Sequence, residues 1–373
     1  MSNPFRHGLR RATSPEGGGK TWRPHRGSCR RSRLRGVTLC LALLLPLTAC
    51  GPKYEEMSTT IFAMDTVMNL KLYHAEPAGA VEGMFNGGVE SIYDYERLFS
   101  ATAEGSDVHN INANGGEIVP VSEVTADVLR QAMALSERTD GALDITAYPA
   151  VKAWGFTTGE YRVVDEAERA ELAANIDYAK VELEGETARI PEGMMLDLGA
   201  VAKGYTADRL TDTFRDVGVK HALLDLGQST IVAIGTKPDG SAWRIGIQDP
   251  AGSDYLGVLE LNDQSMGSSG NYQRWFEENG VRYGHIIDPD TAAPANAGLA
   301  GVTVVSDSAL LCDGLSTALF VMGLEEAADH WREYRDFEAI FIEDSGKITI
   351  TAGLKEHFSL TDAYKDREVT VLE

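Results

Sequence analysis

The chain has 373 residues, of which 43% are hydrophobic and 24% charged, and its formal net charge is −22. This length allows one to three domains, and the composition is that of a folded globular protein rather than a collagen, a coiled coil or a disordered chain. Residues 1–49 carry ten Lys or Arg and one acidic residue, which leaves 24 basic and 55 acidic residues, or −31, on the remainder. A body this acidic repels nucleic-acid backbones, so we expect no nucleic-acid partner.

The N-terminal segment is typical of a secretion signal. Residues 1–36 are rich in Arg, Gly, Ser and Pro, and we expect them to be unstructured. Four arginines within residues 30–35 precede the apolar run 37–47, which is too short to span a bilayer comfortably. Leu47-Thr48-Ala49-Cys50 follows and resembles a bacterial lipobox. That resemblance implies that Cys50 is lipidated and holds the protein at the cell membrane, on its extracytoplasmic (periplasmic) side. An ordinary signal peptide with an incidental cysteine is the alternative.

The cysteine count limits the chemistry of the mature chain. Cys29 and Cys40 leave with the signal, and only Cys312 remains beyond Cys50. We therefore expect no intramolecular disulfide. No pair or cluster of Cys and His has the spacing of a zinc site.

The remaining chain predicts alternating runs of strands and helices. Apolar alternation favours a strand over residues 60–73, and apolar residues at helical spacing favour a helix through residues 81–99. Further helices are expected in chain order at 124–138, within 159–179, at 200–217, 307–322 and 324–335. Further strands are expected at 180–184, 187–190, 194–197, several times within 221–269, and at 301–305, with a closing hairpin at 338–351.

Strands in runs with helices between the runs favour an α+β fold, with antiparallel sheets packed against helices, over a doubly wound sheet. The chain shows no internal repeat and no long linker. We divide it into a disordered N-terminus with a lipoprotein signal peptide (1–49), a lipidated cysteine and tether (50–59), one catalytic domain (60–362) and a C-terminal tail (363–373).

Residues 139–146, Thr-Asp-Gly-Ala-Leu-Asp-Ile-Thr, place two acids and a glycine at a helix end. Taken alone, they favour a helix cap followed by a turn. Residues 196–205, Leu-Asp-Leu-Gly-Ala-Val-Ala-Lys-Gly-Tyr, are more suggestive. A strand ends, a glycine follows and a helix begins, an arrangement that presents N–H groups to an anion. Lys203 in the first turn fits a nearby phosphate, although the spacing is not that of a P-loop.

Residues 267–272 form a turn of small residues, and residues 285–289 place His285 between a glycine and an apolar strand. A histidine held partly dry can transfer protons, although a lone histidine is more often structural. In residues 313–319, Asp313 and Thr317 are spaced i, i+4 and share one helix face. Their hard oxygens suit Mg²⁺, with waters, a carbonyl or substrate phosphates completing the octahedron. The alternative is that Asp313 caps the helix and Thr317 bonds to a carbonyl of its own helix.

In order and spacing these segments resemble the ApbE family of FAD:protein FMN transferases. The resemblance includes Met64-Asp65-Thr66 and runs from about residue 61 to residue 360. It implies a T-fold-like single catalytic unit whose substrate is FAD and whose cofactor is Mg²⁺. The residues implied to border the FAD are Met64, Ala142, Leu143, Asp144, Asp197, Lys203 and Ile287. The metal would be held by Asp313, Thr317 and the carbonyl of Ala200. His285, Lys203 and Asp313 are the catalytic candidates.

The implied reaction is the transfer of FMN from FAD to a threonine of a partner flavoprotein, such as a membrane redox subunit, with release of AMP. Phosphoryl transfer depends mostly on positioning and charge neutralisation, which such a site could supply. Two alternatives remain open. A Mg²⁺-dependent FAD pyrophosphatase would use the same site, and a non-catalytic flavin-binding lipoprotein would need no metal there.

Overall fold

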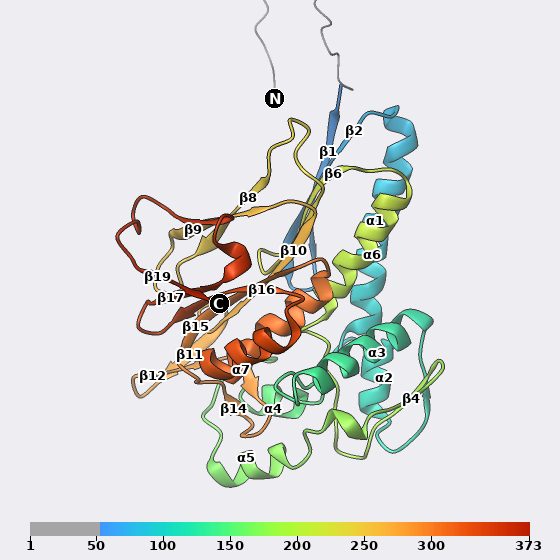
Figure 1. The fold of residues 1–373 in the computed structure, drawn as a ribbon. Coiled ribbons are helices and arrows are strands. Elements are labelled where there is room, and N and C mark those ends of the chain that lie inside the picture. Colours follow the sequence, from blue (N-terminus) through green and yellow to red (C-terminus); the bar gives the residue numbers. More distant parts are fainter. Residues whose placement is uncertain (1–52) are drawn as a thin grey trace, which may run out of the picture. The chain divides into compact units, whose positions relative to one another are not determined.

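The computed structural model describes residues 53–373 (Figure 1). The predicted signal peptide and Cys50 therefore lie outside the described residues. Within this part of the chain there are seven α-helices. They are α1 (Ala78–Phe99), α2 (Asp107–Ala113), α3 (Glu123–Arg138), α4 (Tyr148–Ala153), α5 (Glu166–Ala173), α6 (Ala202–Asp216) and α7 (Ala309–Tyr334). No helix among residues 53–373 combines the length and hydrophobicity needed to cross a membrane.

A nine-stranded sheet forms the centre of the fold, in the order β1-β2-β6-β7-β10-β15-β16-β17-β19. Its strands are β1 (Glu55–Ala63), β2 (Thr66–His74), β6 (His221–Asp225), β7 (Thr230–Ile234), β10 (Gln264–Gly270), β15 (Leu299–Ser306), β16 (Glu338–Glu343), β17 (Ile348–Thr351) and β19 (Val369–Leu372). Every neighbouring pair is antiparallel except β17 and β19. The expected antiparallel α+β class is confirmed.

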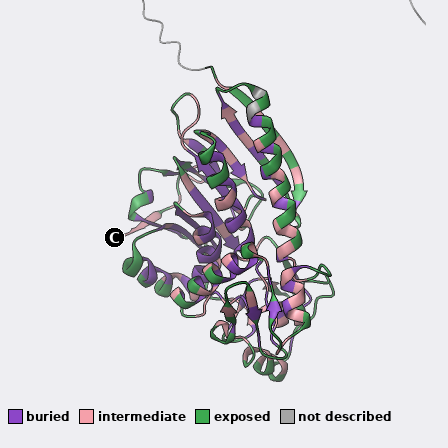
Figure 2. Cartoon of the chain, turned by 90° about the vertical axis from the view of Figure 1, so that its right-hand side faces the viewer, coloured by how far each residue is buried: buried purple, intermediate pink, exposed green. Residues whose placement is uncertain are grey.

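Both faces of this sheet are covered. Along β7, Val232 and Ile234 belong to the core shared with α1 and α6, whereas Ile231 and Ala233 face the opposite side. Because side chains alternate along a strand, this pattern requires a layer on each face. The second layer is a small antiparallel sheet of β8 (Trp243–Gln248), β9 (Tyr255–Leu261) and β18 (Phe358–Leu360). Figure 2 shows the buried strands between helices whose outer sides are exposed.

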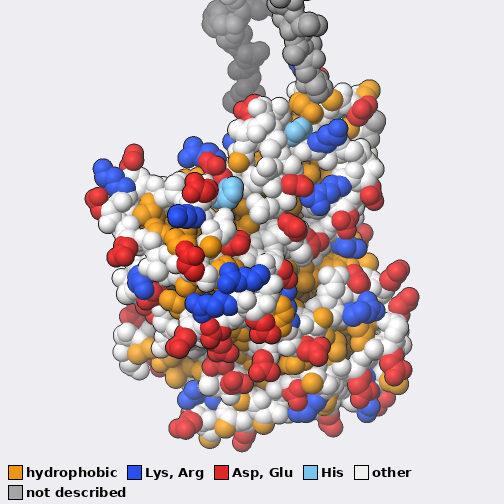
Figure 3. All heavy atoms as spheres, in the orientation of Figure 1, with side chains coloured by type: hydrophobic (Ala, Val, Ile, Leu, Met, Phe, Trp, Pro, Cys, Tyr) orange, Lys and Arg blue, Asp and Glu red, His pale blue; other side chains and the backbone are white. Residues whose placement is uncertain are grey.

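Smaller elements complete the lower part of the view in Figure 1, where α2, α3, α4 and α5 gather. One small sheet joins β3 (Val119–Pro120), β5 (Thr187–Arg189) and β4 (Glu182–Glu184). Two short hairpins pair β11 (Trp275–Glu278) with β12 (Val281–Gly284) and β13 (Ile287–Asp288) with β14 (Ala293–Pro294). Two 3₁₀ turns are η1 (Tyr178–Lys180) and η2 (Ala352–Leu354). On the face shown in Figure 3, acidic side chains are scattered among Lys and Arg side chains.

Several expected elements are confirmed within narrow limits. The predicted helix at 124–138 is α3, and the predicted hairpin at 338–351 is formed by β16 and β17. The predicted break between two helices is Gly323, whose φ of 78° and ψ of 174° interrupt α7. These elements have strong local signals, because apolar periodicity or turn residues mark their limits.

Three expectations were wrong. Residues 60–73 form two strands rather than one, since the chain reverses at Met64 and Asp65, whose φ values are 48° and 59°. Residues 194–197 form no strand, only an isolated parallel bridge between Ala147 and Met195. The ends set apart as tether and tail also join the main sheet, because β1 begins at Glu55 and β19 pairs with β17.

Candidate active site

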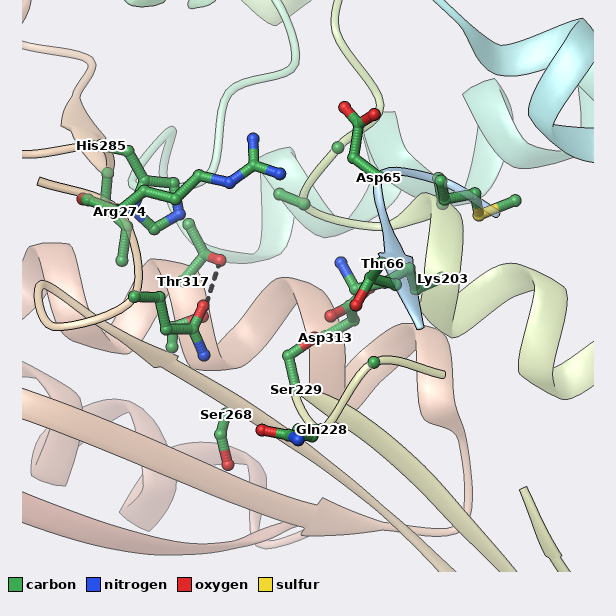
Figure 4. Close-up of a pocket in the computed structure, with 18 of the residues that line it drawn as sticks. Asp65, Thr66, Lys203, Gln228, Ser229, Ser268, Arg274, His285, Asp313 and Thr317 are labelled. Carbon is green, nitrogen blue, oxygen red and sulfur yellow. Dashed lines mark hydrogen bonds between the residues drawn. The ribbon is translucent and has the colours of Figure 1, made fainter. Parts of the chain in front are cut away.

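One large cavity brings together all eleven of the candidate residues that the sequence places in the domain. Its volume is about 1120 Å³, above the roughly 300–1000 Å³ of common small-ligand sites and large enough for a dinucleotide. Its walls come from the turn between β1 and β2, residues 142–148, the start of α6, strand β10, helix α7 and the segment after β12. These segments are distant in sequence and converge in Figure 4.

The start of α6 forms one wall of the cavity. The chain turns at residues 197–201, where the Gly199 N–H donates to the Asp197 carboxylate at 3.2 Å. Val201 precedes the helix and makes no side-chain capping bond. In the first turn the Ala202 N–H is accepted by the Leu198 carbonyl and the Gly204 N–H by Asp313, so among residues 53–373 only the Lys203 N–H is left for an anion, beside the Lys203 ammonium.

Asp313, on α7, contacts the first turn of α6. It is buried, with 5% of its surface exposed. One carboxylate oxygen accepts the Gly204 N–H at 3.0 Å, and the other accepts the Thr230 hydroxyl at 2.9 Å. Ser308 caps α7, so Asp313 does not cap its own helix. Burial raises the pKa of the Asp313 carboxyl, and the positive charge of Lys203 opposes that shift. A second cation at this carboxylate would oppose it further.

Thr317 lies one turn along α7 from Asp313. Its hydroxyl lies 3.1 Å from the Ser269 hydroxyl on β10, and among residues 53–373 it makes no hydrogen bond to a carbonyl of its own helix. The same stretch holds no group of three or more His, Cys, Asp or Glu suited to a metal. The predicted set differs in kind, since it combines one carboxylate, one hydroxyl and one carbonyl. These are the hard oxygen donors that Mg²⁺ accepts alongside substrate phosphates, so the residues present fit that ion.

His285 lies across the cavity from Lys203 (Figure 4). Its backbone N–H and its Nδ1 both contact the carbonyl of Arg274, at 3.1 and 3.3 Å. Burial lowers the pKa of His285 to about 4, and the charges of Arg274 and Lys203 contribute to the shift. The imidazole is therefore neutral near pH 7 and able to accept a proton.

The two acids predicted to border the FAD differ in their surroundings. Asp144 is engaged by its own loop, since its carboxylate accepts the N–H and hydroxyl of Thr146 at 2.8 and 2.7 Å and the Tyr178 N–H at 2.9 Å. Asp197 lines the same cavity as Lys203 and Arg274. Burial raises the pKa of both carboxyls, and at Asp197 the two cations oppose the shift.

The remaining candidates supply shape rather than charge. Met64 occupies the turn between β1 and β2, where its N–H donates to Glu96 at 2.7 Å. Ala142, Leu143 and Ile287 contribute apolar surface to the cavity wall.

Comparison with known proteins shows to which family the chain belongs. The model of the ApbE family matches residues 64–341, which is most of the chain. The chain belongs to the ApbE family. The FAD:protein FMN transferase of Treponema pallidum is 30% identical over 88% of this chain and 96% of its own length. A Klebsiella pneumoniae protein of the same name is 34% identical over 80% of this chain and 93% of its own.

Solved structures of ApbE proteins have the same fold. The Thermotoga maritima ApbE protein superposes with a TM-score of 0.73 at 28% identity, covering 85% of this chain and all of that one. The flavin transferase ApbE from Vibrio cholerae also gives 0.73, at 29% identity, over 82% of this chain and all of its own.

Sequence reasoning missed two residues at this site, one behind the cavity wall and one that lines it. Thr230, which holds Asp313, lies in the buried strand β7 and shows no signal apart from a hydroxyl in an apolar run. Arg274 is exposed, lines the cavity and was not singled out. The signal that could have indicated Arg274 is its position between the motifs at residues 267–272 and 285–289, four residues after Gly270.

Proposed function

We propose that this protein is a FAD:protein FMN transferase that attaches FMN to a threonine of a partner flavoprotein and releases AMP. One observation carries the proposal. A single cavity of dinucleotide size holds a lysine at a helix start, a buried carboxylate beside that lysine, and a histidine across from the lysine. Family membership and the names of the relatives support the same activity.

The reaction balances without a nucleophile from the enzyme. The threonine oxygen of the acceptor forms a bond to the phosphorus of the FMN half, and the bond from that phosphorus to the bridging oxygen breaks. AMP leaves with the bridging oxygen, and the threonine proton passes to a base. His285 is suited to this role because it is neutral near pH 7. Lys203 would neutralise charge on the phosphates as the leaving group departs.

The proposal includes Mg²⁺ held by Asp313, Thr317 and the carbonyl of Ala200. When bound, the ion would polarise a phosphoryl oxygen and stabilise the leaving phosphate. The chain's own contribution is the placement of Asp313, which two hydrogen bonds hold in a buried position beside Lys203. A binder without catalysis would have no need for a metal at the pyrophosphate.

We further propose that Cys50 is lipidated and that the enzyme works at the extracytoplasmic face of the cell membrane. Membrane redox subunits bearing an acceptor threonine are partners of suitable location. Incorporation of labelled palmitate into the wild type but not into Cys50→Ala would test this. Equal labelling of both would reject lipidation at this residue.

The activity is tested by incubating the chain with FAD, Mg²⁺ and a threonine-bearing acceptor domain. AMP release and the mass of the acceptor are followed together, with Asp313→Ala as the control. An acceptor that gains one FMN, and gains none with the variant, supports the transferase. AMP and free FMN without a modified acceptor would favour the pyrophosphatase, and FAD that is bound but never cleaved would reject both enzyme functions.

A further inference from the structure

Arg274 is a cation at the cavity to which neither the motifs nor the proposed mechanism gives a role. It follows β10 and directly precedes β11. The N–H and the ring of His285 both hold its carbonyl, at 3.1 and 3.3 Å, so its backbone is fixed at the base of the β11–β12 hairpin. In Figure 4 its side chain runs from the His285 side of the cavity toward the side of Asp65.

The acidic side chains that line the cavity outnumber the basic ones, so each unpaired cation there is a candidate for binding an anionic ligand. Six acids and three permanent cations line it: Asp65, Glu96, Asp144, Asp197, Asp225 and Asp313, with Lys203, Arg244 and Arg274. Arg244 is within ion-pair distance of Glu260, at 3.9 Å. Among residues 53–373, the side chains of Lys203 and Arg274 form no ion pair or hydrogen bond with another residue. Two free cations therefore remain in a cavity that is otherwise acidic.

These two cations act on the same groups from opposite sides. Both oppose the burial-induced rise in the pKa of Asp197, and both add to the lowering of the pKa of His285. Lys203 comes from α6 and Arg274 from the far side of the cavity, as Figure 4 shows. A group with two adjacent negative charges, placed between them, would be matched by one cation on each side.

We propose that Arg274 binds the pyrophosphate of FAD from the open side of the cavity, opposite Lys203. This rests on the proposed function, since it concerns the substrate of that reaction. Arginine suits the role because its planar guanidinium offers paired donors to phosphate oxygens. The Arg274 side chain is exposed, which fits a residue that contacts the ligand from the solvent side of the cavity rather than from its interior wall.

The test compares FAD with riboflavin, which shares the flavin ring and lacks phosphate. Affinities are measured by flavin fluorescence with the full chain in detergent, with EDTA added to prevent turnover. We expect Arg274→Ala to weaken FAD binding about tenfold, the size of one charge-assisted contact, and to leave riboflavin binding unchanged. Arg274→Lys should recover part of the loss.

Arg282→Ala is the matched control. Arg282 lies on the same hairpin, and its guanidinium stacks on Trp275 at 4.1 Å outside the cavity lining. Its substitution by alanine removes one positive charge, as Arg274→Ala does, without removing a cation from the cavity. The proposal is overturned if Arg274→Ala and Arg282→Ala bind FAD alike, or if Arg274→Ala loses riboflavin as much as FAD. Failure of the wild type to bind FAD at all would instead reject the proposed function.

Discussion

The contact between α6 and α7 leaves no room for a side chain at Gly204, and this predicts the effect of a single methyl group. A Cβ at Gly204 would lie 2.6 Å from Cα of Leu310 and would also overlap the Ala309 carbonyl oxygen. These are backbone atoms of α7, so they cannot rotate away, and the two helices must separate. Overpacking of this kind costs about 1–3 kcal/mol, and we expect Gly204→Ala to lose about 2 kcal/mol of unfolding free energy.

Gly87→Ala is the control because the substitution is the same and the surroundings differ. Gly87 lies in the interior of α1, exposed, and a Cβ there meets no atom within 4 Å. Alanine is favoured over glycine in a helix by up to about 1 kcal/mol, so this variant should become more stable. The two variants are therefore expected to change in opposite directions.

Urea unfolding followed by circular dichroism measures the stability of both variants, and the rate of AMP release measures their activity. Separation of the helices lengthens the bond from the Gly204 N–H to Asp313, which is 3.0 Å in the native chain. We therefore expect Gly204→Ala to lose activity even under conditions where it is fully folded. A Gly204→Ala protein as stable as Gly87→Ala would show that α6 and α7 accommodate the added methyl group without cost.

Further predictions concern three single side chains. Asp313→Asn keeps the size of the side chain and removes the charge, so AMP release should fall at least about 100-fold, while a loss under about tenfold would argue against a metal ligand. His285 has its pKa lowered to about 4 by burial and nearby cations. Its active neutral form persists above that value, so kcat/KM should fall only as the pH drops toward 4, and a fall centred near 6.5 would contradict the assignment. His285→Gln should lower kcat about 10²- to 10⁴-fold at neutral pH. Asp65→Gly removes a non-glycine residue at a φ of 59° and should raise the free energy of unfolding by about 0.5 kcal/mol, seen as a higher urea midpoint, whereas a lower midpoint would mean that the Asp65 side chain makes a stabilising contact.

Local signals predicted the longer helices well because each carries its own periodicity, whereas the short helices α2 and α4 were not predicted. The limits of α3 and the break in α7 follow from apolar spacing and from Gly323. The hairpin of β1 and β2 was missed for the opposite reason. Two-residue hairpin turns favour Asn-Gly or Asp-Gly, and here the turn is Met64-Asp65, with both residues in the left-handed region.

The candidate site was predicted as a set of residues, but its geometry was not. Gly204 and Asp313 are 109 residues apart, and no spacing rule links them. Only the packing of α6 on α7 brings them together. The same holds for Arg274 and His285. Arg274 directly precedes β11 and His285 directly follows β12, so the pairing of these two strands brings them together. Order and spacing of motifs therefore identified the family, whereas contacts between distant segments needed the fold.

The two helices that carry the site hold each other by reciprocal capping. Asp313 of α7 accepts an N–H from the first turn of α6, and Asp208 of α6 accepts two first-turn N–H groups of α7 at 2.7 and 3.0 Å, as well as the Ser308 hydroxyl at 2.8 Å. Each carboxylate lies at the positive end of the other helix, which stabilises its charge despite burial. The separation of Lys203 from Asp313 is thus set by helix packing rather than by loops. Differences in acceptor choice between family members are then expected to arise in the loops around the cavity, because the helices that place Lys203 and Asp313 cannot shift without breaking both caps.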